Sequence, residues 1–221
     1  FGVANVSSRR RMVSSSSHRP FHLYIGRIYF ITGHVIHSDF LMDDVKKKIC
    51  QQVLGRVTRE LSISLYAWVI LNNHYHLMCD FGEEGASELT FATPNGKKMV
   101  RSDEREFVTD RRNTRMARFI RKFHSVTAME FNRIDVAEGR KIWYQYWDYC
   151  IRNRPDFWRH FNYIAQNPLK HGLVRTLDAA YCYPHSSNPI WLKRFGVDGL
   201  SESFEKYPVR DWTPSDGECA E

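Results

Sequence analysis

Residues 63–80 read Ile63-Ser-Leu-Tyr-Ala-Trp-Val-Ile-Leu-Asn-Asn-His-Tyr-His-Leu-Met-Cys-Asp80, and this stretch decides the fold. Apolar, β-branched and aromatic residues predict a buried strand over 63–71 and a returning strand over 74–80. The pair Asn72-Asn73 between them is typical of a tight turn. The stretch therefore predicts an antiparallel hairpin whose second strand begins with His74-Tyr75-His76.

Further segments extend this hairpin on both sides. A strand pattern covers 22–32, helical periodicity covers 45–61 and 116–131, and aromatic residues predict a strand over 142–151. Asp156 is the expected N-cap of a last helix that ends at Asn167, because Pro168 disfavours helical backbone before it. The resulting order of strands and helices predicts an α+β fold in which helices cover one antiparallel sheet.

The 221 residues suffice for one domain with appendages. Residues 1–20 are rich in Ser and Arg and predict a flexible basic arm. Residues 82–110 have no periodicity and predict a long loop or an insertion. We expect the main folded domain to cover 21–187 and residues 188–221 to form a C-terminal tail.

Composition excludes several classes of protein. No apolar run approaches the ~20 residues of a membrane span, and no secretory signal pattern opens the chain. Five scattered cysteines without a CxxC pair disfavour a disulfide scaffold or a zinc finger, so we expect a cytoplasmic protein. The glycine motifs of P-loop and Rossmann sites are absent. No obvious carboxylate triad points to a two-metal nuclease.

The chain is basic, with a net charge of +7, and the excess lies in its second half. Residues 111–175 hold fourteen Lys or Arg against five Asp or Glu. Basic groups that follow phosphates, interleaved with rings that stack on bases, are typical of proteins that bind single-stranded nucleic acid. Aromatics that fill the core beside a solvated helix face fit the same pattern, so both interpretations stay open. The interleaved rings are Trp143, Tyr144, Tyr146, Trp147, Tyr149 and Trp158.

Two pairs of residues are candidates for chemistry. In a strand, His74 and His76 project from one face and could occupy adjacent positions on a divalent metal. In a helix, Tyr163 and Asn167 are spaced i, i+4, so a phenol and an amide oxygen face the same space. A tyrosine becomes a nucleophile when its proton is removed or its oxygen lies in a cationic site. Taken alone, each pair is better explained as ordinary structural residues.

Three motifs in combination resemble a known family. Residues 68–77, Trp-Val-Ile-Leu-Asn-Asn-His-Tyr-His-Leu, look like the histidine–hydrophobe–histidine (HUH) strand of the single-tyrosine HUH transposases. Residues 161–173, Phe-Asn-Tyr-Ile-Ala-Gln-Asn-Pro-Leu-Lys-His-Gly-Leu, look like the tyrosine helix of the REP-associated tyrosine transposase branch. Residues 139–152 are similar to the segment before that helix. The resemblance covers about 21–187, with the histidines before the tyrosine as in transposases.

Two departures from the family pattern are visible. Asn72 stands where the family usually has proline, which should alter only the turn. The segment 83–110 is longer than usual and is interpreted as a lineage-specific insertion.

The resemblance implies a ferredoxin-like antiparallel sheet with helices on one face, the HUH endonuclease fold. It implies that His74 and His76 hold Mg²⁺ or Mn²⁺, that Asn167 is the third ligand, and that Tyr163 is the nucleophile. Gln166 is the alternative third ligand, because Pro168 disfavours helical backbone at Asn167. The residues expected to bind DNA are Arg140, Lys141, Arg152 and Lys170.

The activity so implied is cleavage and rejoining of single-stranded or hairpin DNA through a 5′-phosphotyrosine intermediate, without ATP. One alternative is a domesticated DNA or RNA hairpin-binding protein that has no catalytic activity. A metal-dependent hydrolase that does not need Tyr163 is another. The sequence leaves open whether one chain completes the site or a homodimer shares it.

Overall fold

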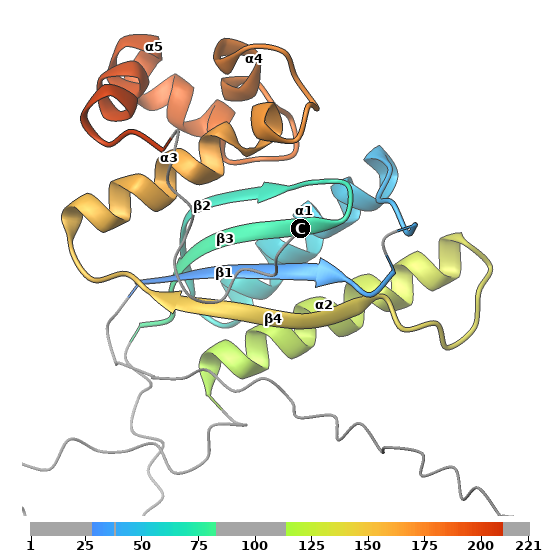
Figure 1. Cartoon of the computed structure of the whole chain (residues 1–221). Coiled ribbons are helices and arrows are strands. Elements are labelled where there is room, and N and C mark those ends of the chain that lie inside the picture. Colours follow the sequence, from blue (N-terminus) through green and yellow to red (C-terminus); the bar gives the residue numbers. More distant parts are fainter. Residues whose placement is uncertain (1–27, 38, 83–113, 210–221) are drawn as a thin grey trace, which may run out of the picture.

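The computed structural model describes residues 28–37, 39–82 and 114–209. The expected basic arm and residues 83–110 of the expected insertion lie outside this part of the chain. Figure 1 shows the elements in their order along the chain. They are β1 (Ile28–Val35), α1 (Asp44–Glu60), β2 (Ser64–Ile70), β3 (His74–Asp80), α2 (Arg115–Ile134), β4 (Trp143–Cys150), α3 (Arg154–Lys170), α4 (Leu177–Tyr181) and α5 (Asn188–Lys206).

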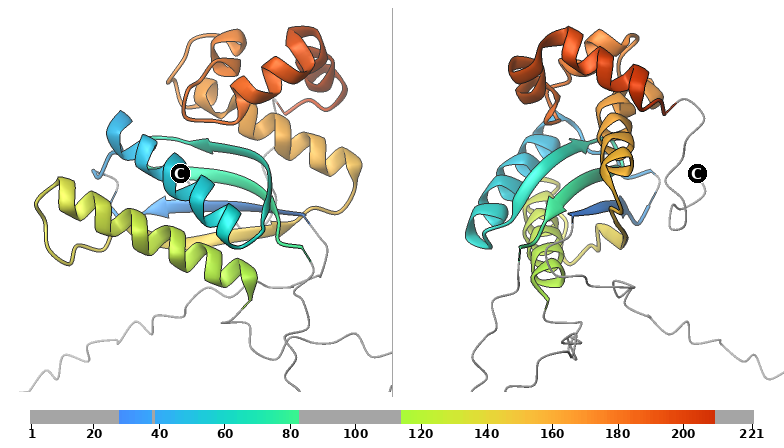
Figure 2. Two further views of the ribbon diagram at one scale, coloured as in Figure 1. Left: turned by 180° about the vertical axis from the view of Figure 1, so that it is seen from behind. Right: turned by 90° about the vertical axis from the view of Figure 1, so that its left-hand side faces the viewer.

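The four strands form one antiparallel sheet in the order β2-β3-β1-β4, which confirms the α+β class and the ferredoxin-like sheet. Helices α1 and α2 cover one face, and α3 crosses the other, as the right-hand view of Figure 2 shows. Because strand residues alternate between faces, β3 serves two cores. Tyr75, Leu77 and Cys79 pack towards α1 and α2, whereas Met78 and the ring of His76 face α3.

Residues of β1 lie directly opposite the histidines of β3. Thr32 pairs with His76 and His34 pairs with His74 in the antiparallel register. Between them, Gly33 lies opposite Tyr75, where a Cβ atom would come 2.4 Å from the tyrosine ring. This position therefore requires glycine, since any side chain here would collide with the buried ring of Tyr75.

Helix α3 is longer at both ends than the sequence predicts. Asn153, not Asp156, is the N-cap, and its side chain accepts a hydrogen bond from the Asp156 backbone N–H at 2.9 Å. The helix also continues through Pro168 to Lys170. A proline inside a helix removes one N–H donor and crowds the preceding turn, yet the backbone N–H of His171 still donates to the Asn167 carbonyl at 3.0 Å. The expected end at Asn167 was therefore wrong.

The expected C-terminal tail is also wrong for the described part of 188–221, because α5 occupies residues 188–206 and packs against α3. The buried side chain of Asn188 donates to the carbonyls of Ala165 in α3 and Ala180 in α4, both at 2.8 Å. Asn162 of α3 donates in the same way to two carbonyls near the end of α5. Helices α3, α4 and α5 therefore form one layer.

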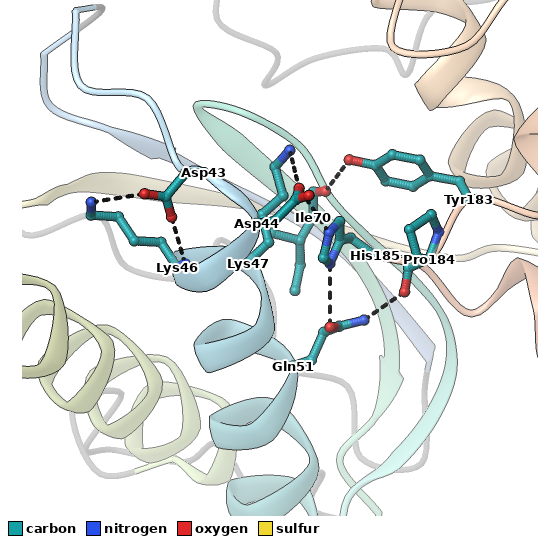
Figure 3. Close-up of polar contacts among 9 residues, drawn as sticks. All are labelled: Asp43, Asp44, Lys46, Lys47, Gln51, Ile70, Tyr183, Pro184 and His185. Carbon is teal, nitrogen blue, oxygen red and sulfur yellow. Dashed lines mark hydrogen bonds and ion pairs between the residues drawn. The ribbon is translucent and has the colours of Figure 1, made fainter. Parts of the chain in front are cut away.

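The segment that leads into α5 covers the edge of β2. The Ile70 backbone N–H donates to the His185 carbonyl at 2.8 Å, so this segment adds to the sheet. Figure 3 shows the ring of His185 between Asp44 and Gln51 of α1, with ring nitrogens 3.1 and 3.3 Å from their oxygens. Gln51 also donates to the Pro184 carbonyl at 2.8 Å. These contacts fasten the C-terminal helices to the opposite layer.

Asn188→Ala is expected to destabilise the protein, because it leaves two buried carbonyl groups without their donor. The expected loss in the free energy of unfolding is about 2–4 kcal/mol, measured by urea denaturation. Ile190→Ala is the matched control on the same helix, since the Ile190 side chain is 63% exposed. Equal, small effects of the two substitutions would contradict the packing of α5 described above.

A half-buried histidine, His124 of α2, makes the stability of the protein depend on pH. The Tyr75 hydroxyl lies 2.7 Å from His124 Nε2, and burial lowers the pKa of His124 to about 3 from its ordinary 6.5. The unfolded chain therefore binds a proton near pH 6.5 that the folded chain does not. We expect the free energy of unfolding to fall as the pH drops from 6.5 towards 3, by up to about 1.4 kcal/mol per pH unit from this group.

Urea unfolding of His124→Gln across this pH range tests the assignment. The variant should lose the His124 share of the pH dependence, because glutamine does not titrate. His37→Gln, at an exposed position, should keep the wild-type pH dependence. If the free energy of unfolding of His124→Gln depends on pH as steeply as that of the wild-type protein, other groups cause the pH dependence.

Candidate functional site

The two histidines of the HUH motif lie side by side on the face of the sheet that α3 covers. Their ring centroids are 5.0 Å apart, and both side chains are almost fully buried. This is the shared strand face that the i, i+2 spacing predicts. The ring of His76 also stacks on Phe30 of β1, at a centroid distance of 5.3 Å.

Hydrogen bonds orient both imidazole rings through the same nitrogen. His74 Nδ1 lies 2.7 Å from Asn73 Oδ1, which can only accept, so this nitrogen carries the proton. His76 Nδ1 lies 2.8 Å from the hydroxyl of Thr32. Both of these contacts use Nδ1 and leave Nε2 of each ring to face a metal, as in sites where a neighbouring group orients a metal-ligating histidine.

Both histidines are neutral in the folded protein. Burial, and then the neighbouring imidazoles of His171 and His34 and the ammonium of Lys170, lower the pKa of His74 to about 2. Burial also holds the pKa of His76 well below its usual range. A neutral imidazole offers a lone pair to a cation, so this environment suits metal ligation at physiological pH.

Tyr163, Asn167 and Lys170 form one stripe along α3, because they are spaced by four and three residues. The Tyr163 ring meets the His76 ring edge-on, at a centroid distance of 5.3 Å. The Lys170 ammonium donates to the Tyr163 hydroxyl at 3.3 Å. A single chain therefore brings the predicted nucleophile to the predicted ligands.

Asn167 carries an unsatisfied oxygen in this buried stripe. Its amide nitrogen donates to the Tyr163 carbonyl at 2.9 Å, which turns the amide oxygen away from that carbonyl. The oxygen has no solvent contact and no hydrogen-bond partner, although buried acceptors are normally paired. Gln166 is partly exposed. Asn167, and not the partly exposed Gln166, therefore has the buried amide oxygen that lacks a hydrogen-bond donor.

Two further histidines adjoin the pair, and the sequence did not single them out as site residues. His34 of β1 stacks on His74 with ring centroids 5.0 Å apart, and the His171 ring lies 4.7 Å from that of His74. The i+4 spacing from Asn167 was a signal for His171. His34 becomes visible only through the register of β1 and β3, in which it lies opposite His74.

The four cations expected to bind DNA do not form one surface. Arg140 and Lys141 precede β4 and Arg152 follows it, so a strand of roughly 25 Å separates them. Arg140 is engaged in an ion pair with Asp135. Lys170 alone lies beside Tyr163. The aromatic residues of β4 fit both the core and the nucleic-acid interpretation. Trp143 is buried in the core, whereas the next residue, Tyr144, is 52% exposed.

The residues present fit a divalent metal with mixed nitrogen and oxygen ligands. Two neutral imidazoles and an unpaired amide oxygen lie around Tyr163. A bound metal would explain why this amide oxygen is buried without a hydrogen-bond partner. Within the described ranges, no three His, Cys, Asp or Glu side chains could hold a metal ion together. A third ligand from the amide of Asn167 agrees with that finding, since asparagine is not among those residue types.

Comparisons with known proteins agree with the geometry. No protein-family model matches the chain. A REP-associated tyrosine transposase of Escherichia coli (strain K12) is 22% identical over 161 residues, which cover 72% of this chain and 76% of that protein. A solved structure of a REP-associated tyrosine transposase bound to a REP hairpin matches with a TM-score of 0.55 at 21% identity. That match covers 92% of this chain and 98% of the other.

These matches confirm the resemblance to the REP-associated tyrosine transposases, and the structural match confirms the fold. The described residues contain no helix that is both long and apolar enough to cross a membrane.

Proposed function

We propose that this protein is a metal-dependent DNA-strand transesterase that cuts and rejoins single-stranded or hairpin DNA through Tyr163. The observation that carries the proposal is the contact between the Tyr163 ring and the His76 ring, beside the unpaired amide oxygen of Asn167. A nucleophile-type oxygen, two neutral imidazoles and a ligand-type oxygen are what a single-tyrosine DNA-cleaving site needs.

The Tyr163 hydroxyl is the attacking group. Its oxygen forms a bond to the scissile phosphorus while the bond from phosphorus to the 3′ oxygen breaks. The 3′ oxygen takes up a proton, the phenol loses one, and the downstream DNA strand remains on Tyr163 through its 5′ phosphate, as a phosphodiester. Bond energy is thereby conserved for rejoining, so no nucleotide cofactor is required.

His74, His76 and Asn167 would hold Mg²⁺ or Mn²⁺. The metal supplies Lewis-acid polarisation of the phosphate when bound. The protein contributes orientation: Thr32 and Asn73 fix the two imidazole rings, and the Tyr163 carbonyl fixes the amide of Asn167. In this proposal one chain supplies all of these groups.

The proposed substrate is a DNA hairpin with single-stranded flanks, in the cytoplasm. The solved structure with the same fold is bound to a REP hairpin. DNA would reach Tyr163 from the Lys170 end of the stripe, because Lys170 is exposed, whereas Tyr163 is only 5% exposed. Positive charge near that entrance would attract a phosphate backbone.

A denaturing gel tests this function against its alternatives. The probe is a pool of DNA hairpins with randomised flanks, labelled at either the 5′ or the 3′ end and incubated with Mn²⁺. We expect the 3′-labelled fragments to migrate with the protein and the 5′-labelled fragments to be released. Binding without cleavage would support a non-catalytic hairpin binder, and cleavage without an adduct would support a hydrolase.

A further inference from the structure

The ammonium group of Lys170 donates a hydrogen bond to the Tyr163 oxygen. It lies 3.3 Å from that oxygen as a donor and 5.1 Å from the centroid of the ring. The two residues are seven positions apart on α3, so two helical turns place them on one face. Lys170 is exposed, and its ammonium reaches the edge of a buried ring.

This geometry assigns the ammonium a role at a reacting atom. The hydrogen bond runs from the lysine nitrogen to the tyrosine oxygen, so the oxygen accepts and its own proton points elsewhere. A fixed donor aimed at an oxygen gains strength as negative charge develops there. Contact with a DNA phosphate alone would not require the ammonium to lie on the tyrosine.

We propose that Lys170 is a catalytic residue that stabilises negative charge on the Tyr163 oxygen, both during attack and when the tyrosine departs on rejoining. The proposal rests on the proposed function and names a further residue of the same site. In cleavage, a lone pair of the tyrosine oxygen bonds to phosphorus, and the electrons of the broken bond pass to the 3′ oxygen. The proton released by the phenol balances the one that the 3′ oxygen takes up.

In rejoining the same steps run backwards. The 3′ hydroxyl attacks the phosphotyrosine, the bond from phosphorus to the tyrosine oxygen breaks, and its electron pair stays on that oxygen beside the ammonium. A lysine that only held DNA would affect the binding of both strands. A lysine at the leaving oxygen affects the rate of both reactions at saturating DNA.

Lys170→Met tests the proposal by single-turnover cleavage with a hairpin that the wild-type protein cuts. We expect the cleavage rate at saturating DNA to fall about 100-fold, the order of effect seen when one donor to a developing oxyanion is removed. Hairpin affinity should change less than about threefold, and the slope of log affinity against log salt by no more than about one. Lys170→Arg should restore most of the rate. Arg175→Met is the matched control, an exposed cation in the same basic stretch.

Replacing Tyr163 with 3,5-difluorotyrosine separates chemistry from binding, because fluorine stabilises the phenolate without help from a cation. In Lys170→Met the fluorinated residue should raise the rate at least about fivefold, whereas with Lys170 intact it should change the rate little. Equal relative effects in both backgrounds would overturn the proposal, as would a wild-type rate in Lys170→Met. A wild-type protein that forms no adduct would instead refute the proposed function itself.

Discussion

Tyr163→Phe is expected to abolish the covalent protein–DNA adduct completely while hairpin binding persists. The substitution removes one oxygen and keeps the ring, which packs edge-on against His76 and, at a centroid distance of 6.0 Å, against Phe30. These ring contacts do not require the hydroxyl, so the free energy of unfolding should change by less than about 1 kcal/mol. The loss of activity would then be chemical in origin.

The adduct assay with a 3′-labelled hairpin measures this loss, and a filter-binding assay measures the retained affinity. Tyr181→Phe is the matched control, because Tyr181 is a buried tyrosine of α4 that packs against Phe204 of α5. An adduct that persisted in Tyr163→Phe would refute the assignment of the nucleophile.

Substitution of either HUH histidine is expected to abolish cleavage. His76→Leu and His74→Leu each remove one imidazole lone pair from the proposed metal site without offering another ligand atom, and cleavage depends on the metal as Lewis acid. We expect a decrease of at least about 1,000-fold in the cleavage rate with Mg²⁺ or Mn²⁺. DNA affinity should remain within a few-fold, because phosphate and base contacts elsewhere carry most of it.

The burial of the two imidazole rings determines which substitutions are suitable for this test. Because both side chains are almost fully buried, alanine would leave a cavity, whereas leucine fills most of the volume and has no atom that can bind a metal. Thermal unfolding should confirm that the variants are folded, and His37→Gln provides an exposed histidine for comparison. EDTA should suppress wild-type cleavage, and excess Mn²⁺ should restore it. Wild-type rates in either variant would show that these histidines hold no essential metal.

Local patterns sufficed for the central hairpin. The predicted strands 63–71 and 74–80 correspond to β2, Ser64–Ile70, and β3, His74–Asp80. An apolar run, a tight turn and a second run specify such a hairpin within about twenty residues, without help from the rest of the chain. The shared face of His74 and His76 follows from the same short-range period.

The misjudged elements depend on contacts between distant residues. Helix α5 is held by Asn188, whose partners Ala165 and Ala180 belong to other helices. The cluster around His74 includes His34 because strand pairing places them opposite each other across 40 residues of chain. The continuation of α3 through Pro168 brings Lys170 to Tyr163. No local sequence pattern predicts these contacts, so they can be identified only from the folded structure.

Peptide mapping of the covalent adduct tests the central claim most directly. The wild-type protein is incubated with a hairpin that it cuts and Mn²⁺, the attached DNA is trimmed with a nuclease, and the digested protein is examined by mass spectrometry. We predict that the remaining nucleotide is linked to Tyr163, through a 5′ phosphate on its phenolic oxygen. An adduct on any other residue, or cleavage that leaves no nucleotide on the protein, would contradict this account.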